Sequence, residues 1–323
     1  MSETVTTMPD RALRPGGAGS STGGAAPGQP GRAKGPIVWL DMDQQELDDA
    51  YDQLVYAPNR EEIGKRRLAN SAKARAVLGA PARLAYGPSG IERLDLYRSR
   101  AANAPVNIFV HGGAWRANRA ADYGFLAEPF VTAGAHYLIL DFINVEEAGG
   151  SLFPMVEQVR RAVGWVYRNA KSFGGDPERL YLTSHSSGSH LAGCVVTHDW
   201  PSEGLPANIV KGATLSSGMY DLEPVRLSKR SRYVRFTDAM EQELSPQRHL
   251  DRLATALVLA HGTCETPEFK RQTRDFHAAV EAAGKPVELL VGEGYNHFEM
   301  LETLGNPYGL LGRAALAQMR LGA

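Results

Sequence analysis

The sequence predicts an α/β protein whose mostly parallel central sheet is covered by helices on both faces. Six short apolar runs follow one another along the chain, at residues 107–110, 137–140, 180–183, 212–215, 256–260 and 287–291. Because these runs are mostly apolar, each is interpreted as a strand buried on both faces. A helical pattern follows each run, and alternation of this kind is typical of parallel sheets.

Helical patterns also precede the apolar runs. Leu47, Tyr51 and Leu54 recur at helical spacing near the start of the globular part. Apolar and polar side chains alternate over residues 92–98, which indicates a half-buried strand. The early helices and residues 221–250 are candidates for a cap or rim. The helices that we expect lie at residues 41–54, 61–77, 120–133, 156–171, 187–198, 268–283 and 307–321.

Residues 1–36 are expected to form a disordered tail, and residues 37–323 a single domain. Residues 14–36 hold eight glycines and four prolines, with hardly any aliphatic bulk. Such a stretch cannot bury enough apolar area to offset the entropy lost on ordering. The rest of the chain suits one large α/β domain, so a second domain is unnecessary.

Charge and composition exclude several classes of partner. The 35 Lys and Arg residues nearly cancel the 36 Asp and Glu residues, so no overall field would attract nucleic acid or an anionic membrane. No window approaches the ~18 apolar residues of a membrane span, and no apolar run near the start suits a secretory signal. Two cysteines are too few for a disulfide framework or a cysteine-rich zinc site. We therefore expect a cytoplasmic protein without a metal or other cofactor.

A serine-rich pentapeptide follows the strand at 180–183 and leads directly into a helix. Its sequence is Ser184-His185-Ser186-Ser187-Gly188. A strand, a tight turn centred on Ser186 and an immediate helix match the nucleophile elbow, usually written G-x-S-x-G, except that Ser184 replaces the first glycine. The alternative is a serine-rich helix cap, since serine commonly begins helices. Only Ser186 has a glycine two positions later, which favours it over the neighbouring serines.

Two adjacent glycines follow the strand at 107–110, in the segment His111-Gly112-Gly113-Ala114-Trp115. Such glycines let backbone N–H groups point into a cavity without obstruction by side chains. Together with the N–H of Ser187, the residue after the candidate nucleophile, they can stabilise the oxyanion of an acyl-transfer intermediate. The alternative is a simple Gly-Gly turn, with His111 as a core histidine.

An acidic residue and a histidine follow the last two strands. Glu265 and Glu268 come after the strand at 256–260, and His297 comes after the strand at 287–291. This completes the chain order serine, acid, histidine. A serine needs a base that takes its proton, and a carboxylate orients that base. We expect His297 to be the base and Glu265 the acid, with Glu268 left open as the alternative acid.

These segments together resemble the α/β-hydrolase superfamily, and within it the hormone-sensitive-lipase-like esterases and the kynurenine formamidases (arylformamidases). The resemblance covers about residues 40–320. The oxyanion segment is similar to the family's H-G-G-x-W motif, and Ser217-Gly218 lies in a turn similar to S-G-x-x-D-L-x-P. The segments that carry the resemblance are HGGAW (111–115), GGDPERLYLTSHSSGSHLAG (174–193), VKGATLSSGMYDLEPV (210–225), TPEFKRQ (266–272) and YNHF (295–298).

The resemblance implies an α/β-hydrolase fold with a small N-terminal helical lid over the site. It implies that Ser186 is the nucleophile, His297 the base and Glu265 the acid, at a position where the family usually has Asp. The oxyanion donors would be Gly113, Ala114 and Ser187, with Gly112 supporting the turn. Ala114 stands where the family has its third glycine, and residues 141–146 depart from the family's D-Y-R-L-A-P stretch.

The expected function is hydrolysis of carboxylic esters or aryl amides, N-formyl arylamines included, through an acyl-enzyme. The sequence does not choose between a general esterase and an arylformamidase. A non-catalytic binding protein on a hydrolase scaffold is the main alternative, and a metal-dependent hydrolase is a weaker one. The expected partner is a small-molecule ester or amide, without nucleic acid or membrane, and a homodimer is left open. The basic run Arg226, Lys229, Arg230, Arg232 and Arg235 is either a solvated face or a feature that favours anionic substrates.

Overall fold

The computed structural model describes residues 32–322. The predicted tail lies outside the described residues except for residues 32–36, so its disorder stays a prediction. The strands of the described part are β1 (Ile37–Trp39), β2 (Met42–Asp43), β3 (Ala82–Ala85), β4 (Arg93–Tyr97), β5 (Ala104–Val110), β6 (His136–Leu140), β7 (Gly175–His185), β8 (Gly212–Ser216), β9 (Ala256–Gly262) and β10 (Val287–Gly292).

The helices of the described part lie mostly between these strands. The α-helices are α1 (Gln44–Ala50), α2 (Gln53–Tyr56), α3 (Arg60–Leu78), α4 (Ala127–Thr132), α5 (Phe153–Asn169), α6 (Ser187–Val196), α7 (Glu223–Leu227), α8 (Asp238–Glu243), α9 (Pro267–Ala282), α10 (His297–Leu304) and α11 (Leu310–Gln318). The 3-10 helices are η1 (Ala120–Leu126), η2 (Ala170–Phe173), η3 (Trp200–Glu203), η4 (Lys229–Arg232), η5 (Pro246–Arg248) and η6 (Leu250–Arg252).

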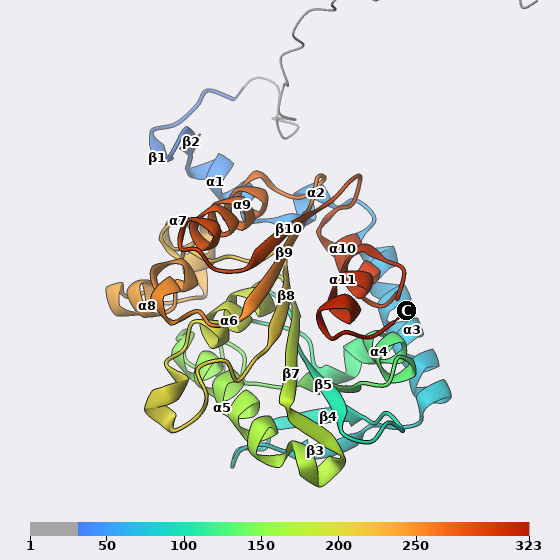
Figure 1. Ribbon diagram of the computed structural model, residues 1–323. Helices are drawn as coiled ribbons and strands as arrows, with labels where there is room; N and C mark the ends of the chain where they lie inside the picture. Colours follow the sequence, from blue (N-terminus) through green and yellow to red (C-terminus); the bar gives the residue numbers. More distant parts are fainter. Residues whose placement is uncertain (1–31, 323) are drawn as a thin grey trace, which may run out of the picture. The chain divides into compact units, whose positions relative to one another are not determined.

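The main sheet has eight strands in the order β10-β9-β8-β7-β5-β6-β4-β3 (Figure 1). The six strands from β10 to β6 are parallel, while β4 pairs antiparallel with β6 and β3 pairs antiparallel with β4. The six parallel strands are the six apolar runs of the sequence, so the prediction of a mostly parallel sheet is confirmed. Ligands of such sheets bind beyond the carboxyl ends of the strands.

Helices cover both faces of the sheet, and each face has its own core. Along β5, Val106, Ile108 and Val110 belong to the core under α5, α6 and α9, while Phe109 belongs to the core under α4, α10 and α11. Successive side chains of a strand point to opposite faces, so a strand between two helical layers must be apolar on both. This requirement explains why the central strands read as continuous apolar runs.

The predicted helix over residues 41–54 is wrong in its extent. The structure has two short helices there, α1 and α2, because α1 ends at Ala50 and the side chain of Asp52 then accepts the backbone N–H of Leu54 to begin α2. Leu47 and Tyr51 are buried as expected, but Leu54 is 50% exposed. The predicted second helix (61–77) and the strand over 92–98 are confirmed as α3 and β4.

Other boundaries differ from the predictions in smaller ways. The predicted helix 120–133 is a 3-10 helix, η1, followed by α4, and the predicted helix 307–321 is reduced to α11. Strands β1 to β3 and helix α10 were not predicted. Helix α10 begins at His297, and Asn296 caps it by accepting the N–H groups of Phe298 and Glu299.

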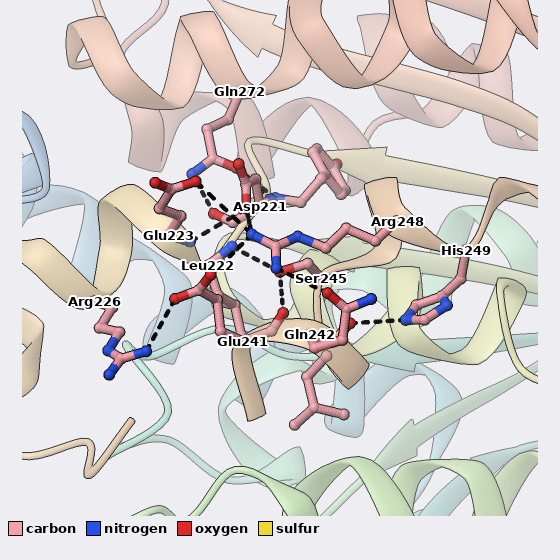
Figure 2. A network of polar contacts seen from close by, with 12 residues as sticks. Asp221, Leu222, Glu223, Arg226, Glu241, Gln242, Ser245, Arg248, His249 and Gln272 are labelled. Atoms are coloured by element: carbon pink, nitrogen blue, oxygen red, sulfur yellow. Dashed lines mark hydrogen bonds and ion pairs between the residues drawn. The ribbon is translucent and has the colours of Figure 1, made fainter. Parts of the chain in front are cut away.

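Residues 221–250 form a series of short helices, α7, η4, α8 and η5, beside α9. Polar contacts fix this segment: the side chain of Gln272 on α9 accepts the backbone N–H of Asp221, and Arg248 pairs with Asp221 and Glu241 (Figure 2). The segment is therefore held as a defined part of the domain, and its role as a cap or rim stays a prediction. In residues 32–322, no helix is both long and apolar enough to cross a membrane.

Candidate active site

Ser186 lies on the sharp turn between β7 and α6. Its backbone has φ 59° and ψ −131°, a conformation that L-residues rarely adopt and that marks a strained turn. A Cβ atom at Gly188 would lie 2.2 Å from the carbonyl oxygen of Val110, so only glycine fits two positions after Ser186. This geometry is that of the predicted elbow.

The serine at position 184, which departs from the elbow pattern, is accommodated by local hydrogen bonds. The hydroxyl of Ser184 lies 2.9 Å from that of Ser189, and the hydroxyl of Ser189 donates to the carbonyl oxygen of Ser216 at 2.7 Å. All three side chains are buried. Burying a hydroxyl that has such hydrogen-bond partners costs little free energy of folding. Serine in place of glycine at position 184 therefore does not disrupt the turn.

His297, the first residue of α10, faces Ser186. Its Nε2 lies 2.8 Å from Oγ of Ser186, and its Nδ1 lies 2.7 Å from Oε2 of Glu265. Because an ionised carboxylate only accepts hydrogen bonds, Nδ1 carries the proton, which leaves Nε2 free to accept the hydroxyl of Ser186. This arrangement lets the imidazole take the serine proton.

Glu265 is buried and has donors on both oxygens. Its Oε1 accepts hydrogen bonds from the hydroxyl of Ser217 at 2.6 Å and from the backbone N–H of Gly262 at 2.7 Å. Burial alone would raise the pKa of the Glu265 carboxyl, but His297 and these donors hold the pKa below its usual value. Glu265 is therefore ionised at neutral pH and able to orient His297. Sequence reasoning missed Ser217, although it follows β8 at the edge where the other site loops meet.

Glu268, the alternative acid, makes different contacts. Its carboxylate binds the guanidinium of Arg271 at 2.6 and 2.8 Å and accepts the hydroxyl of Tyr51 at 2.8 Å. Of the two carboxylates that the sequence left open, Glu265 is the one that contacts His297.

The loop after β5 has the backbone form expected of an oxyanion hole. Gly113, Ala114 and Trp115 all have positive φ, at 124°, 54° and 63°. The backbone N–H of Trp115 donates to Oγ of Ser187 at 3.1 Å, which ties the loop to the start of α6. Within residues 32–322, the backbone N–H groups of Gly113 and Ala114 donate to no protein acceptor, and Ser187 is the first residue of its helix, where N–H groups lack helical acceptors.

Gly112 packs directly against the elbow. A Cβ atom there would lie 2.7 Å from the carbonyl oxygen of His185 and 2.8 Å from Cβ of Ser186. The carbonyl oxygen of Gly112 accepts the side-chain amide of Asn118 at 3.1 Å and Nδ1–H of His111 at 2.9 Å. Gly112 therefore supports the turn, as predicted, while Asn118 is a supporting residue that the sequence did not indicate.

His185 contacts His297, the candidate base. Its Nε2–H donates to the backbone carbonyl oxygen of His297 at 2.7 Å, and the two ring centroids are 4.4 Å apart. Burial, with a contribution from nearby His297, lowers the pKa of His185 well below its ordinary value, so the ring is neutral. The prediction that His185 is not the base agrees with this geometry, but its contact with His297 was not foreseen.

Two segments distant in sequence cover the site. The side-chain amide nitrogen of Gln53 on α2 lies 3.4 Å from Oε2 of Glu265. Arg230 on η4 donates to the backbone carbonyl of Tyr51 at 3.2 Å. Ser186 is 7% exposed and His297 is 3% exposed. The N-terminal helices thus contact the candidate acid, which is where the resemblance places a lid.

The basic run has two kinds of member. Arg226 pairs with Asp238 and Glu241, Lys229 with Asp52, and Arg232 with Asp48. These pairs fit a solvated or rim position. Arg230 instead is buried.

The structure has a cavity beside the oxyanion loop and another between α3 and α10. A small one, of about 10 Å³, lies beside the oxyanion loop and is lined by Gly112, Trp115 and Ser187 among others. A second, of about 220 Å³, lies between α3 and α10 and is lined by Ile63, Phe298 and Leu301 among others. In the part of the chain that the structure describes, no group of three or more His, Cys, Asp or Glu side chains could hold a metal ion.

Comparison with known proteins identifies relatives of the chain. Residues 94–204 match the BD-FAE family model. A kynurenine formamidase from Danio rerio is 31% identical over 291 residues, covering 86% of this chain and 97% of that protein. A kynurenine formamidase from Salmo salar is 29% identical over 280 residues, covering 82% of this chain and 93% of that protein.

Solved structures show the same fold. A putative thioesterase from Silicibacter sp. TM1040 superposes with a TM-score of 0.73 at 23% identity, covering 84% of this chain and 98% of the other. The Pyrobaculum calidifontis esterase superposes with a TM-score of 0.67 at 18% identity, covering 86% and 97%. Given the Danio rerio relative and this fold, the chain belongs to the α/β-hydrolase esterase family that includes the kynurenine formamidases.

Proposed function

We propose that the protein is a serine hydrolase that cleaves carboxylic esters or aryl amides, N-formyl arylamines among them, through an acyl-enzyme on Ser186. The observation that carries this proposal is the continuous hydrogen-bonded chain from Ser186 through His297 to Glu265, with contacts of 2.8 and 2.7 Å. The relatives that are named kynurenine formamidases support the formamidase branch.

The reaction has two halves. Oγ of Ser186 attacks the carbonyl carbon while Nε2 of His297 takes the hydroxyl proton, and the N–H groups of Gly113, Ala114 and Ser187 stabilise the oxyanion. The bond to the leaving oxygen or nitrogen breaks, and the leaving group receives the proton from His297. Water then attacks the acyl-enzyme with the same proton transfers, which releases the acid and restores Ser186.

A fluorophosphonate probe and a substrate pair test the proposal. Wild type should be labelled once, at Ser186, and Ser186→Ala should not be labelled. Comparison of p-nitrophenyl acetate with N-formylkynurenine then separates a general esterase from an arylformamidase, and the mass of a trapped acyl-enzyme identifies the acyl half. Ser184→Ala is the matched control and should still be labelled. Absence of labelling and of turnover in folded wild type would instead indicate a binding protein on a hydrolase scaffold.

A further inference from the structure

We propose that Arg230 is the specificity-determining residue of this site and binds a carboxylate group carried by the substrate. The inference rests on the proposed function, because it names a substrate class for the same site. That class comprises esters or aryl amides in which one half of the molecule bears a carboxylate. Arg230 is buried, has no acidic partner among residues 32–322, and packs against Trp115 and Phe269, which adjoin the oxyanion loop and His297.

Arg230 is a buried cation without an anion. Its side chain lies on η4 and is 6% exposed, and none of the carboxylates described in residues 32–322 lies within 4 Å of it. Its guanidinium donates to the hydroxyl of Tyr233 at 2.8 Å and to the carbonyl oxygen of Tyr51 at 3.2 Å, both of them uncharged. Among the described residues, its Nε has no hydrogen-bond partner.

The neighbouring basic residues differ from Arg230 because they have acidic partners. Arg226, Lys229, Arg232 and Arg248 each pair with at least one Asp or Glu, and Figure 2 shows the pairs of Arg226 and Arg248 within the 221–250 segment. These four side chains are less buried than Arg230. An exposed cation loses little without a partner, whereas a buried one is costly to leave unpaired. Arg230, the most buried of these five cations, is therefore the one that has no acidic partner among the described residues.

The position of Arg230 connects it to the reacting groups. Its guanidinium carbon lies 5.4 Å from the ring centroid of Trp115, which directly follows the proposed oxyanion donors, and 5.9 Å from that of Phe269. The ring of Phe269 in turn lies 5.1 Å from that of His297. Arg230 thus lies against two aromatic side chains, one adjoining the oxyanion loop and the other adjoining the base.

Two neighbouring buried donors indicate what Arg230 binds. Among the described residues, Nε of Arg230 and Nε1 of Trp115, whose ring lies against the guanidinium, have no hydrogen-bond acceptor. Buried polar groups in native proteins nearly always have partners, so two such donors side by side call for an acceptor. The two ring faces offset part of the charge, but a carboxylate matches the guanidinium fork and supplies the missing negative charge.

Two substrate pairs test the proposal, one for each half of the substrate. N-formylkynurenine is compared with its methyl ester, and p-nitrophenyl hemisuccinate with p-nitrophenyl butyrate. The measured quantity is the ratio of kcat/KM for the carboxylate over the neutral member, together with its split into kcat and KM. Arg230→Gln should lower the ratio for at least one pair by about 10- to 100-fold, mainly through KM, as expected for a lost charge-assisted contact. Arg230→Lys should restore part of it.

Arg232→Gln is the matched control, because Arg232 lies on the same 3-10 helix but is 77% exposed and pairs with Asp48. It should keep the wild-type ratio. Arg67→Gln tests the rival arginine, whose Nε is also unpartnered and which lines the cavity of about 220 Å³. No carboxylate preference in wild type, or a preference that depends on Arg67 and not on Arg230, would overturn the proposal.

Binding to Ser186→Ala separates this proposal from the proposed function. Calorimetric titration with N-formylkynurenine and its methyl ester needs no turnover, so it reports carboxylate recognition alone. The carboxylate should bind at least tenfold more tightly, and adding Arg230→Gln should remove the difference. Turnover by wild type without this Arg230-dependent difference refutes the carboxylate site and leaves the hydrolase proposal standing. Binding that depends on Arg230 without any turnover refutes the hydrolase proposal and keeps the anion site.

Discussion

Ser217 donates a 2.6 Å hydrogen bond to Oε1 of Glu265, the carboxylate oxygen that faces away from His297. Ser217 itself has φ 55°, and its backbone N–H donates to the carbonyl oxygen of Ala260 on the neighbouring strand. The candidate acid, Glu265, is thus held from the β8 side as well as from its own loop. Glutamate has one more rotatable bond than aspartate, so this second attachment fixes the longer side chain toward the base.

Replacing Ser217 by Ala should therefore slow catalysis without removing it. Loss of a hydrogen bond to a charged group costs about 1.5–3 kcal/mol, which corresponds to a roughly 10- to 100-fold fall in kcat if the whole cost appears in orientation of the base. Steady-state kinetics with an ester substrate measures the fall. Ser202→Ala, at an exposed serine that bonds only a local carbonyl, is the control. Unchanged kcat in Ser217→Ala would mean that Ser217 does not position Glu265.

Substitutions of Glu265 and Glu268 should have opposite effects on kcat and on thermal stability. In Glu265→Gln the amide can hold the imidazole in the wrong tautomer, and kcat should fall by roughly 10³- to 10⁴-fold. Glu268→Gln alters the contacts with Arg271 and Tyr51 and should lower thermal stability while kcat stays within about threefold. Kinetics and thermal unfolding of both variants decide the matter, and a larger kcat loss in Glu268→Gln would reverse the assignment of the acid.

His185 is expected to act as a positioning residue for His297. His185→Leu removes the donor to the His297 carbonyl and should lower kcat by about tenfold with little change in KM, whereas His185→Gln can keep a donor and should recover part of the loss. Because burial keeps the pKa of His185 well below its ordinary value, the acid limb of kcat/KM should reflect one ionisation. A limb with slope two in wild type would show that His185 titrates as well.

Two glycines give a matched steric test. Gly188→Ala places Cβ 2.2 Å from the carbonyl oxygen of Val110, so the elbow must shift and both stability and probe labelling should be lost. Gly64 lies inside α3, and a Cβ there meets nothing within 4 Å. Gly64→Ala should therefore raise the free energy of unfolding by about 0.5–1 kcal/mol. Urea unfolding compares the two, and a tolerated Gly188→Ala would contradict the close approach of helix and strand.

The six parallel strands could be predicted because strands buried on both faces are mostly apolar, whereas the short, half-exposed edge strand β3 was not predicted. Sequence reasoning failed at residues 41–54, where helical spacing alone predicted one helix. Asp52 can cap a helix as well as continue one, and only the contact of its side chain with the N–H of Leu54 decides between them. Helix α10 was missed although Asn296 and Glu299 form a capping box, a pattern that is readable in the sequence.

The residues of the candidate site also fall into those that the sequence could indicate and those that it could not. Ser186, Glu265 and His297 could be named because each follows a strand of a parallel sheet, and the ends of those strands meet. Ser217 and Gln53 could not be assigned roles, and Arg230 could not be distinguished from the rest of its basic run. The importance of these residues depends on contacts across more than 40 residues of sequence. The sequence shows the order in which the reactive side chains follow the strands. The contacts that hold each of these side chains in place depend on how distant segments pack.

Burial of His190 should make the folded protein less stable in acid. His190 is buried, and burial lowers its pKa to about 4 from an ordinary value of 6.5. Below about pH 6.5 the unfolded chain binds a proton at this residue that the folded chain does not, so stability falls as the pH decreases from about 6.5 toward 4. At pH 5 the cost is about 2 kcal/mol for His190 alone, from the shift between the two pKa values. The pKa values of His111 and His185 are also lowered by burial, which adds to the effect. Urea unfolding at pH 7.5 and pH 5.0 should therefore give a clearly lower free energy at pH 5.0. In His190→Gln, which does not titrate and can still donate to the carbonyl oxygen of Leu244, the difference should shrink by about 2 kcal/mol. An equal pH dependence in wild type and variant would show that His190 is not held neutral by the fold.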